Sequence, residues 1–199
     1  QLVYCAKFFW WETGYWASID IMHDRAGYYI CWGCLVWVPS VYYLPAYVMT
    51  AMPSATEWSL PAAAALFLAG WTCIFLNYDC DRQRYHFRQT AGKSTVWGAA
   101  PKSVLARYTT VEGRKRESLL LASGYWGLSR HFNYLVEILS ALCWSVSALP
   151  SASSALAYFY VCFLTILLLD RAFRDDRRCA DKYGEAWERY CELVPSRII

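Results

Sequence analysis

The run ASSALAYFYVCFLTILLL, residues 152–169, is followed without a break by DRAFRDDRRCADKYGEAWERYCELVPSRII, residues 170–199. The first run has no charged residue, whereas the second carries seven Lys or Arg and seven Asp or Glu. A charge at the centre of a bilayer costs about 2.5 kcal/mol or more, so the charged tail must lie outside the hydrocarbon. This abrupt change predicts a membrane-spanning helix that leads into a polar segment at the membrane surface.

The same alternation of apolar and charged blocks runs through the whole chain of 199 residues, of which 57% are hydrophobic. Long apolar runs bounded by charged blocks are typical of multi-span membrane proteins. We therefore expect an all-α integral membrane fold, a multi-span helical bundle whose spans cover residues 27–50, 58–78, 134–149 and 152–169. Pro39 and Pro45 are expected to kink the first span.

The charged blocks orient these spans. Residues 79–118 contain nine Lys or Arg against four Asp or Glu, and the positive-inside rule places such a loop in the cytosol. Counting spans in both directions then places residues 170–199 and the polar residues 20–25 on the same side. The sequence thus predicts that three polar blocks meet at the cytosolic membrane surface.

The composition also limits the classes of partner. The net charge is only +3 and the Lys and Arg are interleaved with acids, so no nucleic-acid partner is expected. The nine cysteines show no metal-binding spacing, and Cys31 and Cys34 are interpreted as core residues of a span, so no metal site is predicted. Because the chain begins at Gln1 without Met or a signal peptide, we expect a fragment of a larger protein.

Basic and aromatic residues together in the cytosolic blocks suit a phosphate-bearing nucleotide. Arg makes bidentate contacts to phosphate, and Tyr or Trp can stack on a flat ring. The basic candidates are Arg82, Arg84, Arg88, Arg174, Arg177, Arg178 and Lys182. The alternative interpretation is that these side chains only anchor the chain to anionic lipid.

A second concentration of polar groups, SGYWGLSRHFNY at residues 123–134, stands at the entrance of the third span. Glu137 follows about one turn into that span, where an acid is either functional or extends to the headgroups. His23 and Asp24 present a similar choice between a proton donor and an interfacial ion pair.

Four long motifs in chain order resemble the C-terminal half of the sterol reductase family. They are IDIMHDRAGYYICWGCLVWVP, WGAAPKSVLARYTT, SGYWGLSRHFNY and RDDRRCADKYGEAWERYCELVPSRII. The variants HDRAGYYICWGCLVW and RHFNY favour the Δ7-reductase branch, because the Δ14-reductases and the lamin B receptor typically carry Pro where Phe132 stands.

The resemblance implies a bundle of about ten transmembrane helices in the endoplasmic reticulum, of which this chain is the C-terminal part, with a cytosolic pocket for NADPH. The implied reaction is NADPH-dependent reduction of the sterol C7=C8 double bond, with the sterol and membrane lipid as partners. A Δ14-reductase and a non-catalytic sterol-binding or scaffold relative remain open. So does an isoprenylcysteine methyltransferase-like enzyme that uses S-adenosylmethionine. No oligomeric state is predicted.

The motif matches also imply site residues. Arg84 and Arg88 would be basic cofactor contacts, Leu121 and Trp126 would lie at the pocket wall, and Asn133 and Tyr134 would lie at the nicotinamide end. The tail would add Asp175, Cys179, Ala180, Asp181, Lys182, Tyr183 and Tyr190. Reduction of an alkene also needs a proton, for which the candidate relay groups are Tyr134, Asp24, His23 and Glu137.

Overall fold

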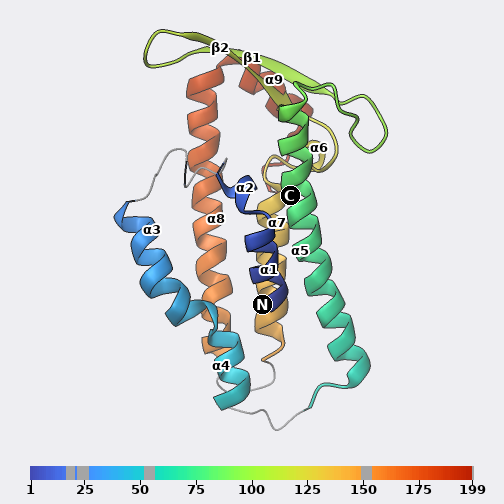
Figure 1. Cartoon of the computed structure of the whole chain (residues 1–199), viewed down its shortest axis with the longest axis vertical. Helices are drawn as coiled ribbons and strands as arrows, with labels where there is room; N and C mark the ends of the chain where they lie inside the picture. Colours follow the sequence, from blue (N-terminus) through green and yellow to red (C-terminus); the bar gives the residue numbers. More distant parts are fainter. Residues whose placement is uncertain (17–20, 22–26, 52–56, 149–153, 199) are drawn as a thin grey trace. The chain divides into compact units, whose positions relative to one another are not determined.

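The computed structural model describes residues 1–16, 21, 27–51, 57–148 and 154–198 (Figure 1). These residues form two compact units, each described here by itself. The apolar unit comprises Gln1–Tyr78 and Val136–Ile166, and the hairpin unit comprises Asp79–Leu135 and Leu167–Ile199. The elements in chain order are α1 (Leu2–Trp10), α2 (Glu12–Tyr15), α3 (Tyr28–Trp32), the π-helix η2 (Gly33–Tyr42), α4 (Leu44–Ala51), α5 (Leu60–Gln89), β1 (Ser103–Thr109), β2 (Lys115–Leu121), α6 (Tyr125–Leu128), α7 (Phe132–Val146), α8 (Ser154–Tyr183) and α9 (Glu185–Leu193).

Three helical stretches among the described residues are long and apolar enough to cross a membrane. They are Gly33–Ala51, Leu60–Gln89 and Ala155–Tyr183, which confirms the predicted helical membrane fold. The remaining predicted span, residues 134–149, corresponds to α7, whose 15 residues are fewer than the roughly 17 that a crossing needs. Its predicted end, residue 149, lies outside the described residues.

The two prolines interrupt the first span, as predicted. Pro39 lies inside η2, and Pro45 is the second residue of α4. Because proline has no N–H to donate, the regular α-helical hydrogen-bond ladder cannot continue through Pro39. Pro45 is tolerated in a first turn, where its missing donor would have no partner anyway. The expected kinks therefore appear as a π-helical stretch and a break at Tyr43.

Small residues bring helices of the apolar unit together. Ala148 of the α7 end and Ala157 of α8 form a buried cluster with Val48 of α4. The Ser145 hydroxyl donates a hydrogen bond to the Ala157 carbonyl oxygen at 2.8 Å. Such close approach of small and hydroxyl residues is the usual packing of helices in lipid, where there is no water to drive association.

The prediction that residues 79–118 are all loop is wrong at its start, because α5 continues without a break to Gln89. The charges mark the end of the apolar run and not the end of the helix. They are spaced for a helix: Arg82 pairs with Asp79 at 2.7 Å and Arg84 with Asp81 at 3.6 Å, each three residues apart.

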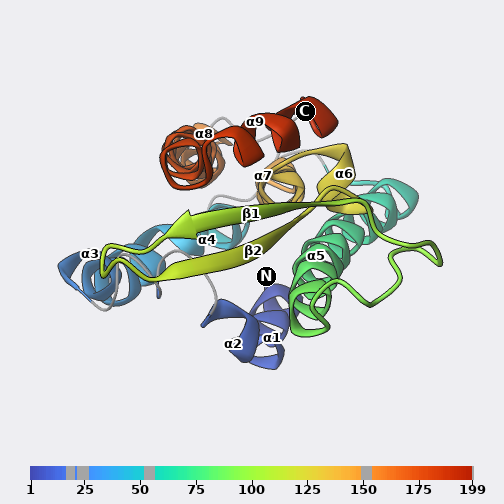
Figure 2. The ribbon, with the colours of Figure 1, turned by 90° about the horizontal axis from the view of Figure 1, so that it is seen from above.

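The sequence analysis also missed the antiparallel hairpin β1–β2. One of its faces carries Ala106 and Leu120, which are buried against α9; Figure 2 shows α9 beside β1. Leu121, one residue later in the alternation, is buried in a second cluster with Phe87 of α5 and Trp126 of α6. The inner end of the hairpin therefore packs against both α9 and the last turns of α5.

Candidate cofactor site

The predicted pocket-wall residues gather around Trp126 in the hairpin unit. The Arg84 guanidinium lies over the Trp126 ring, 3.9 Å from its centroid. Trp126 is 4% exposed, and its Nε1 donates to the Cys80 carbonyl oxygen at 3.0 Å, which joins α6 to α5. Leu121 belongs to the same buried cluster. The buried ring therefore holds the Arg84 guanidinium in place, and a fixed guanidinium suits a ligand with phosphates.

Gly124 makes this close approach of α6 and α5 possible. It has φ +63°, a conformation that favours glycine, and a Cβ there would overlap the side-chain amide of Gln83. That amide oxygen accepts a hydrogen bond from the backbone N–H of Tyr125 at 3.1 Å. The glycine of the SGYWG motif is therefore required by geometry.

The ends of α8 and α9 bring the tail residues to the same cluster. The charge of Arg88 interacts electrostatically with Arg84 and with Cys179, Tyr183 and Tyr190. Burial raises the pKa of Tyr190 to about 12, so its hydroxyl stays protonated, and it makes a long hydrogen bond of 3.5 Å to the Trp126 carbonyl oxygen. Within the described residues Arg88 makes no ion pair, so its charge is available to an anion.

The last turns of α8 contain the other predicted tail residues. Lys182 Nζ lies 4.2 Å from the centroid of the Tyr108 ring on β1. Asp175 forms an ion pair with Arg178. Ala180 and Asp181 are exposed and take no part in these contacts.

Asn133 and Tyr134, predicted at the nicotinamide end, stand where the hairpin unit leads into α7. Asn133 Nδ2 donates to Asp81 Oδ1 at 3.4 Å. The Tyr134 ring stacks on the His131 ring, with centroids 4.9 Å apart and planes within 12°. Burial lowers the pKa of His131 to about 4 against the opposing effect of Asp175, so the imidazole is neutral at pH 7. Its buried Nε2 has no hydrogen-bond partner among the described residues.

The sequence analysis missed a buried ionic cluster that fastens the C-terminal segment, residues 194–197. Arg130 and Asp176 are 8% and 9% exposed, and Arg130 Nη2 lies 3.4 Å from Asp176 Oδ2. Arg130 Nη1 donates to the Val194 carbonyl oxygen at 2.8 Å, and Arg197 Nε donates to Asp176. The backbone N–H groups of Arg130 and His131 donate to the carbonyls of Ser196 and Arg197, each at 3.0 Å. The C-terminal segment thus holds the turn that precedes Asn133.

Two of the proton-relay candidates, Tyr134 and Glu137, lie three residues apart on α7. Glu137 belongs to the apolar unit, where it accepts a hydrogen bond from the Tyr4 hydroxyl at 2.5 Å. The Tyr4 ring also meets Trp144 edge-on at 5.4 Å. Tyr134 belongs to the hairpin unit, and His23 and Asp24 lie outside the described residues. Tyr4 is a partner for Glu137 that no motif had indicated.

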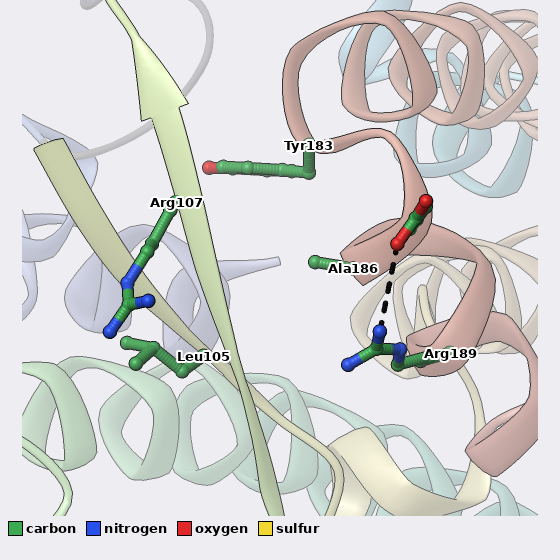
Figure 3. Close-up of a pocket in the computed structure, with 6 residues that line it drawn as sticks. Leu105, Arg107, Tyr183, Ala186 and Arg189 are labelled. Atoms are coloured by element: carbon green, nitrogen blue, oxygen red, sulfur yellow. Dashed lines mark ion pairs between the residues drawn. The ribbon is translucent and has the colours of Figure 1, made fainter. Parts of the chain in front are cut away.

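A cavity of about 620 Å³ opens between β1 and α9 (Figure 3). Its volume is typical of a small-molecule site. Of the predicted cofactor residues only Tyr183 lines it, with its ring directed toward β1. Two arginines flank it, but each has an acidic partner: Arg107 with Glu117 at 2.8 Å and Arg189 with Glu185 at 3.6 Å.

The residues present fit a nucleotide with several phosphates. Among the described residues, Arg88 and Lys182 form no ion pair with an acidic side chain, and Tyr183 adds an aromatic ring that lines the cavity. Donors of this kind bind phosphate and a heterocyclic ring at the same time.

The chain is similar to known proteins over its whole length. The whole chain, residues 1–199, matches the ergosterol biosynthesis ERG4/ERG24 family. It is 59% identical to a 7-dehydrocholesterol reductase of Arabidopsis thaliana and 37% identical to one of Xenopus laevis, each over 199 residues. It is also 39% identical over 201 residues to a Delta(14)-sterol reductase of Methylotuvimicrobium alcaliphilum. These matches cover 100% of the chain but 45%, 41% and 44% of the relatives, so the chain spans less than half of their length.

Proposed function

Because the chain belongs to the ergosterol biosynthesis ERG4/ERG24 family, we propose that it carries the cofactor site of an NADPH-dependent reductase of the sterol C7=C8 double bond. Support for the Δ7 position comes from the 59% identity to a 7-dehydrocholesterol reductase over the full chain. The proposed partners are a sterol and membrane lipid, and the proposed location is the endoplasmic reticulum membrane with the hairpin unit in the cytosol.

The observation that carries the proposal is the stack of Arg84 on Trp126, 3.9 Å apart, beside the unpaired Arg88. Guanidinium groups held on an aromatic face keep their N–H edges free for phosphate oxygens. Such a site binds a dinucleotide better than it binds an apolar sterol, which needs no cation.

The proposed mechanism divides the work among the residues of the chain. Arg84 and Arg88 would hold the cofactor phosphates, the buried Trp126 ring would position Arg84, and Tyr183 would offer an aromatic face to a cofactor ring. Tyr134, held by the stack on His131, orients the reactive end. When bound, NADPH supplies the hydride that a sterol double bond needs.

The reaction also consumes a proton. The proposed donors are Tyr134 and Glu137, two groups of α7 with exchangeable protons, with His23 and Asp24 as further candidates. Glu137 is held by the Tyr4 hydroxyl, so a carboxyl or phenol proton is fixed in place within the apolar unit. A positioned acid of this kind typically contributes about 100-fold or more to the rate.

The test uses the full-length protein in membranes from cells that lack endogenous sterol reductases. NADPH and a sterol 5,7-diene are added, and loss of the conjugated-diene absorbance is followed, with the product identified by mass spectrometry. We expect loss of the diene that depends on NADPH and yields the Δ5 sterol. An unchanged diene in folded protein would contradict Δ7 reduction.

A second candidate is reduction of the sterol C14=C15 double bond. It is favoured by the 39% identity to a Delta(14)-sterol reductase, which is similar to the 37% identity to the Xenopus laevis protein. Adding a sterol 8,14-diene to the same membranes distinguishes the two activities, because only a Δ14-reductase should consume that diene with NADPH. If neither diene is consumed, the non-catalytic sterol-binding alternative gains support.

A further inference from the structure

One face of the β1–β2 hairpin carries cations beside a pair of tyrosines. Arg116 of β2 lies directly opposite Tyr108 of β1, so their side chains leave the same face of the hairpin. Lys182 of α8 places its Nζ 4.2 Å from the Tyr108 ring centroid and 5.0 Å from that of Tyr183. The two tyrosine rings meet edge-to-face at 5.5 Å. The hairpin and the end of α8, distant in sequence, therefore meet at Tyr108 and combine cations with aromatic rings.

The charges on this surface are not neutralised. Among the described residues neither Arg116 nor Lys182 forms an ion pair. The neighbouring arginines of the hairpin differ, because Arg107 pairs with Glu117 at 2.8 Å and Arg114 with Glu112 at 3.3 Å. Arg116, on the same face of the hairpin as Tyr108, is thus an arginine without an ion pair among the described residues.

Tyr183 connects this surface to the cofactor cluster. It meets Tyr108 on one side, it lines the cavity between β1 and α9, and it interacts electrostatically with Arg88. Tyr183 thus links Arg88 to Tyr108, and Tyr108 in turn lies beside Lys182 and opposite Arg116.

We propose that Arg116, together with Lys182, binds the 2′-phosphate of the adenosine ribose and makes the site select NADPH over NADH. This inference rests on the proposed function, because it assumes that the cluster binds a nicotinamide dinucleotide. The two cofactors differ only at this position, where NADPH has a phosphate and NADH has a hydroxyl. Two unpaired cations favour the phosphate, and Arg can hold it with two parallel hydrogen bonds.

Binding without turnover tests the proposal directly. The purified full-length protein is titrated with 2′,5′-ADP and with 5′-AMP, which differ only in the 2′-phosphate, by isothermal calorimetry. We expect Arg116→Ala to weaken 2′,5′-ADP binding about tenfold, the loss of one charged hydrogen bond, and to leave 5′-AMP binding unchanged. Lys182→Ala is expected to act in the same direction.

Lys115→Ala is the matched control. Lys115 is adjacent to Arg116 and carries the same charge, but the alternation of the strand directs it to the opposite face, across from Thr109. Lys115→Ala should leave the affinities for 2′,5′-ADP and 5′-AMP unchanged. An equal loss of 2′,5′-ADP affinity in Lys115→Ala and Arg116→Ala would mean a general charge effect and would overturn the proposal, as would an equal loss for 5′-AMP in Arg116→Ala.

Kinetics separate this inference from the proposed function. In active protein, Arg116→Ala should raise KM for NADPH about tenfold, without changing kcat or KM for NADH. If Arg116→Ala reduces the sterol and its kcat/KM for NADPH relative to NADH equals that of the unaltered protein, the role of Arg116 is refuted while the proposed function stands. If the protein reduces no sterol, but Arg116→Ala loses its preference for 2′,5′-ADP over 5′-AMP, the role of Arg116 stands while the proposed function is refuted.

Discussion

At the scale of single residues, the hairpin unit repeatedly sets a cation on an aromatic ring. Arg84 lies on Trp126, Lys182 on Tyr108, and Arg197 lies 4.4 Å from the Phe173 ring centroid. Each stack fixes a long side chain through its apolar surface; Arg84 and Arg197 also pair with Asp81 and Asp176, whereas Lys182 forms no ion pair among the described residues. This is how a membrane protein can keep fixed cations at its surface without pairing every one with an acid.

The two roles of Trp126 can be separated by substitution. Trp126→Phe removes the hydrogen bond from Nε1 to the Cys80 carbonyl and should cost about 1 kcal/mol of stability, but it keeps a ring beneath Arg84. Trp126→Leu removes both and should also weaken NADP⁺ binding. Thermal unfolding and calorimetry in detergent measure the two effects. Equal losses of NADP⁺ affinity in both variants would contradict the stacking role.

His131 should make the protein sensitive to acid. Its folded pKa of about 4 lies below the ordinary value of 6.5, so the unfolded chain binds the proton more readily. The contribution of neutral His131 to the free energy of unfolding is fully present above pH 6.5. It is lost as the pH falls toward 4, by roughly 3 kcal/mol in total. His131→Phe keeps a ring to stack on Tyr134 and should lose this pH dependence. Unfolding midpoints measured between pH 7 and 4 test it, and identical slopes for both proteins would contradict it.

At the scale of elements, two helices extend beyond the apolar runs from which they were predicted. Both α5 and α8 have 30 residues and continue into charged sequence, because pairs such as Arg82 with Asp79 and Arg174 with Asp170 fit one helical turn. Their charged ends provide Arg84, Arg88 and Lys182. The hairpin adds a β element that sets Arg116 directly opposite Tyr108, whose ring lies 4.2 Å from Lys182 Nζ.

The C-terminal segment should depend on Asp176. Asp176→Ala leaves Arg130 buried without its acid, which should cost about 3 kcal/mol and release residues 194–197. Asp170→Ala on the same helix is the control, because its pair with Arg174 is solvent-exposed and should contribute less than about 1 kcal/mol. Thermal unfolding and carboxypeptidase digestion report the two effects. Equal resistance of both variants to digestion would contradict the view that Asp176 holds residues 194–197 in place.

At the scale of the whole molecule, the proposed orientation can be tested at the hairpin. Val111 at its tip is fully exposed, so a protease site inserted after it should be cleaved without disturbing the strands. In sealed endoplasmic reticulum vesicles containing the full-length protein, we expect cleavage from the cytosolic side without detergent. Residues 51–57 are separated from the loop at residues 79–118 by the span at residues 58–78 and should therefore be lumenal, so a site inserted there should be cut only after detergent. The reverse pattern would overturn the predicted orientation.

The sequence by itself determined the helical membrane fold, because hydrophobic runs and charge blocks are local properties that lipid and water separate directly. Its long motifs also predicted cofactor residues, of which Arg84 and Leu121 lie beside Trp126 in the hairpin unit; their roles stay predictions. Only the tertiary structure decided the hairpin, the burial of Arg130 with Asp176, and which cations stay unpaired. Those features arise from contacts between residues far apart in the chain: Arg130 and Asp176 are 46 positions apart, and nothing in the local sequence distinguishes their pairing from that of any other Arg and Asp.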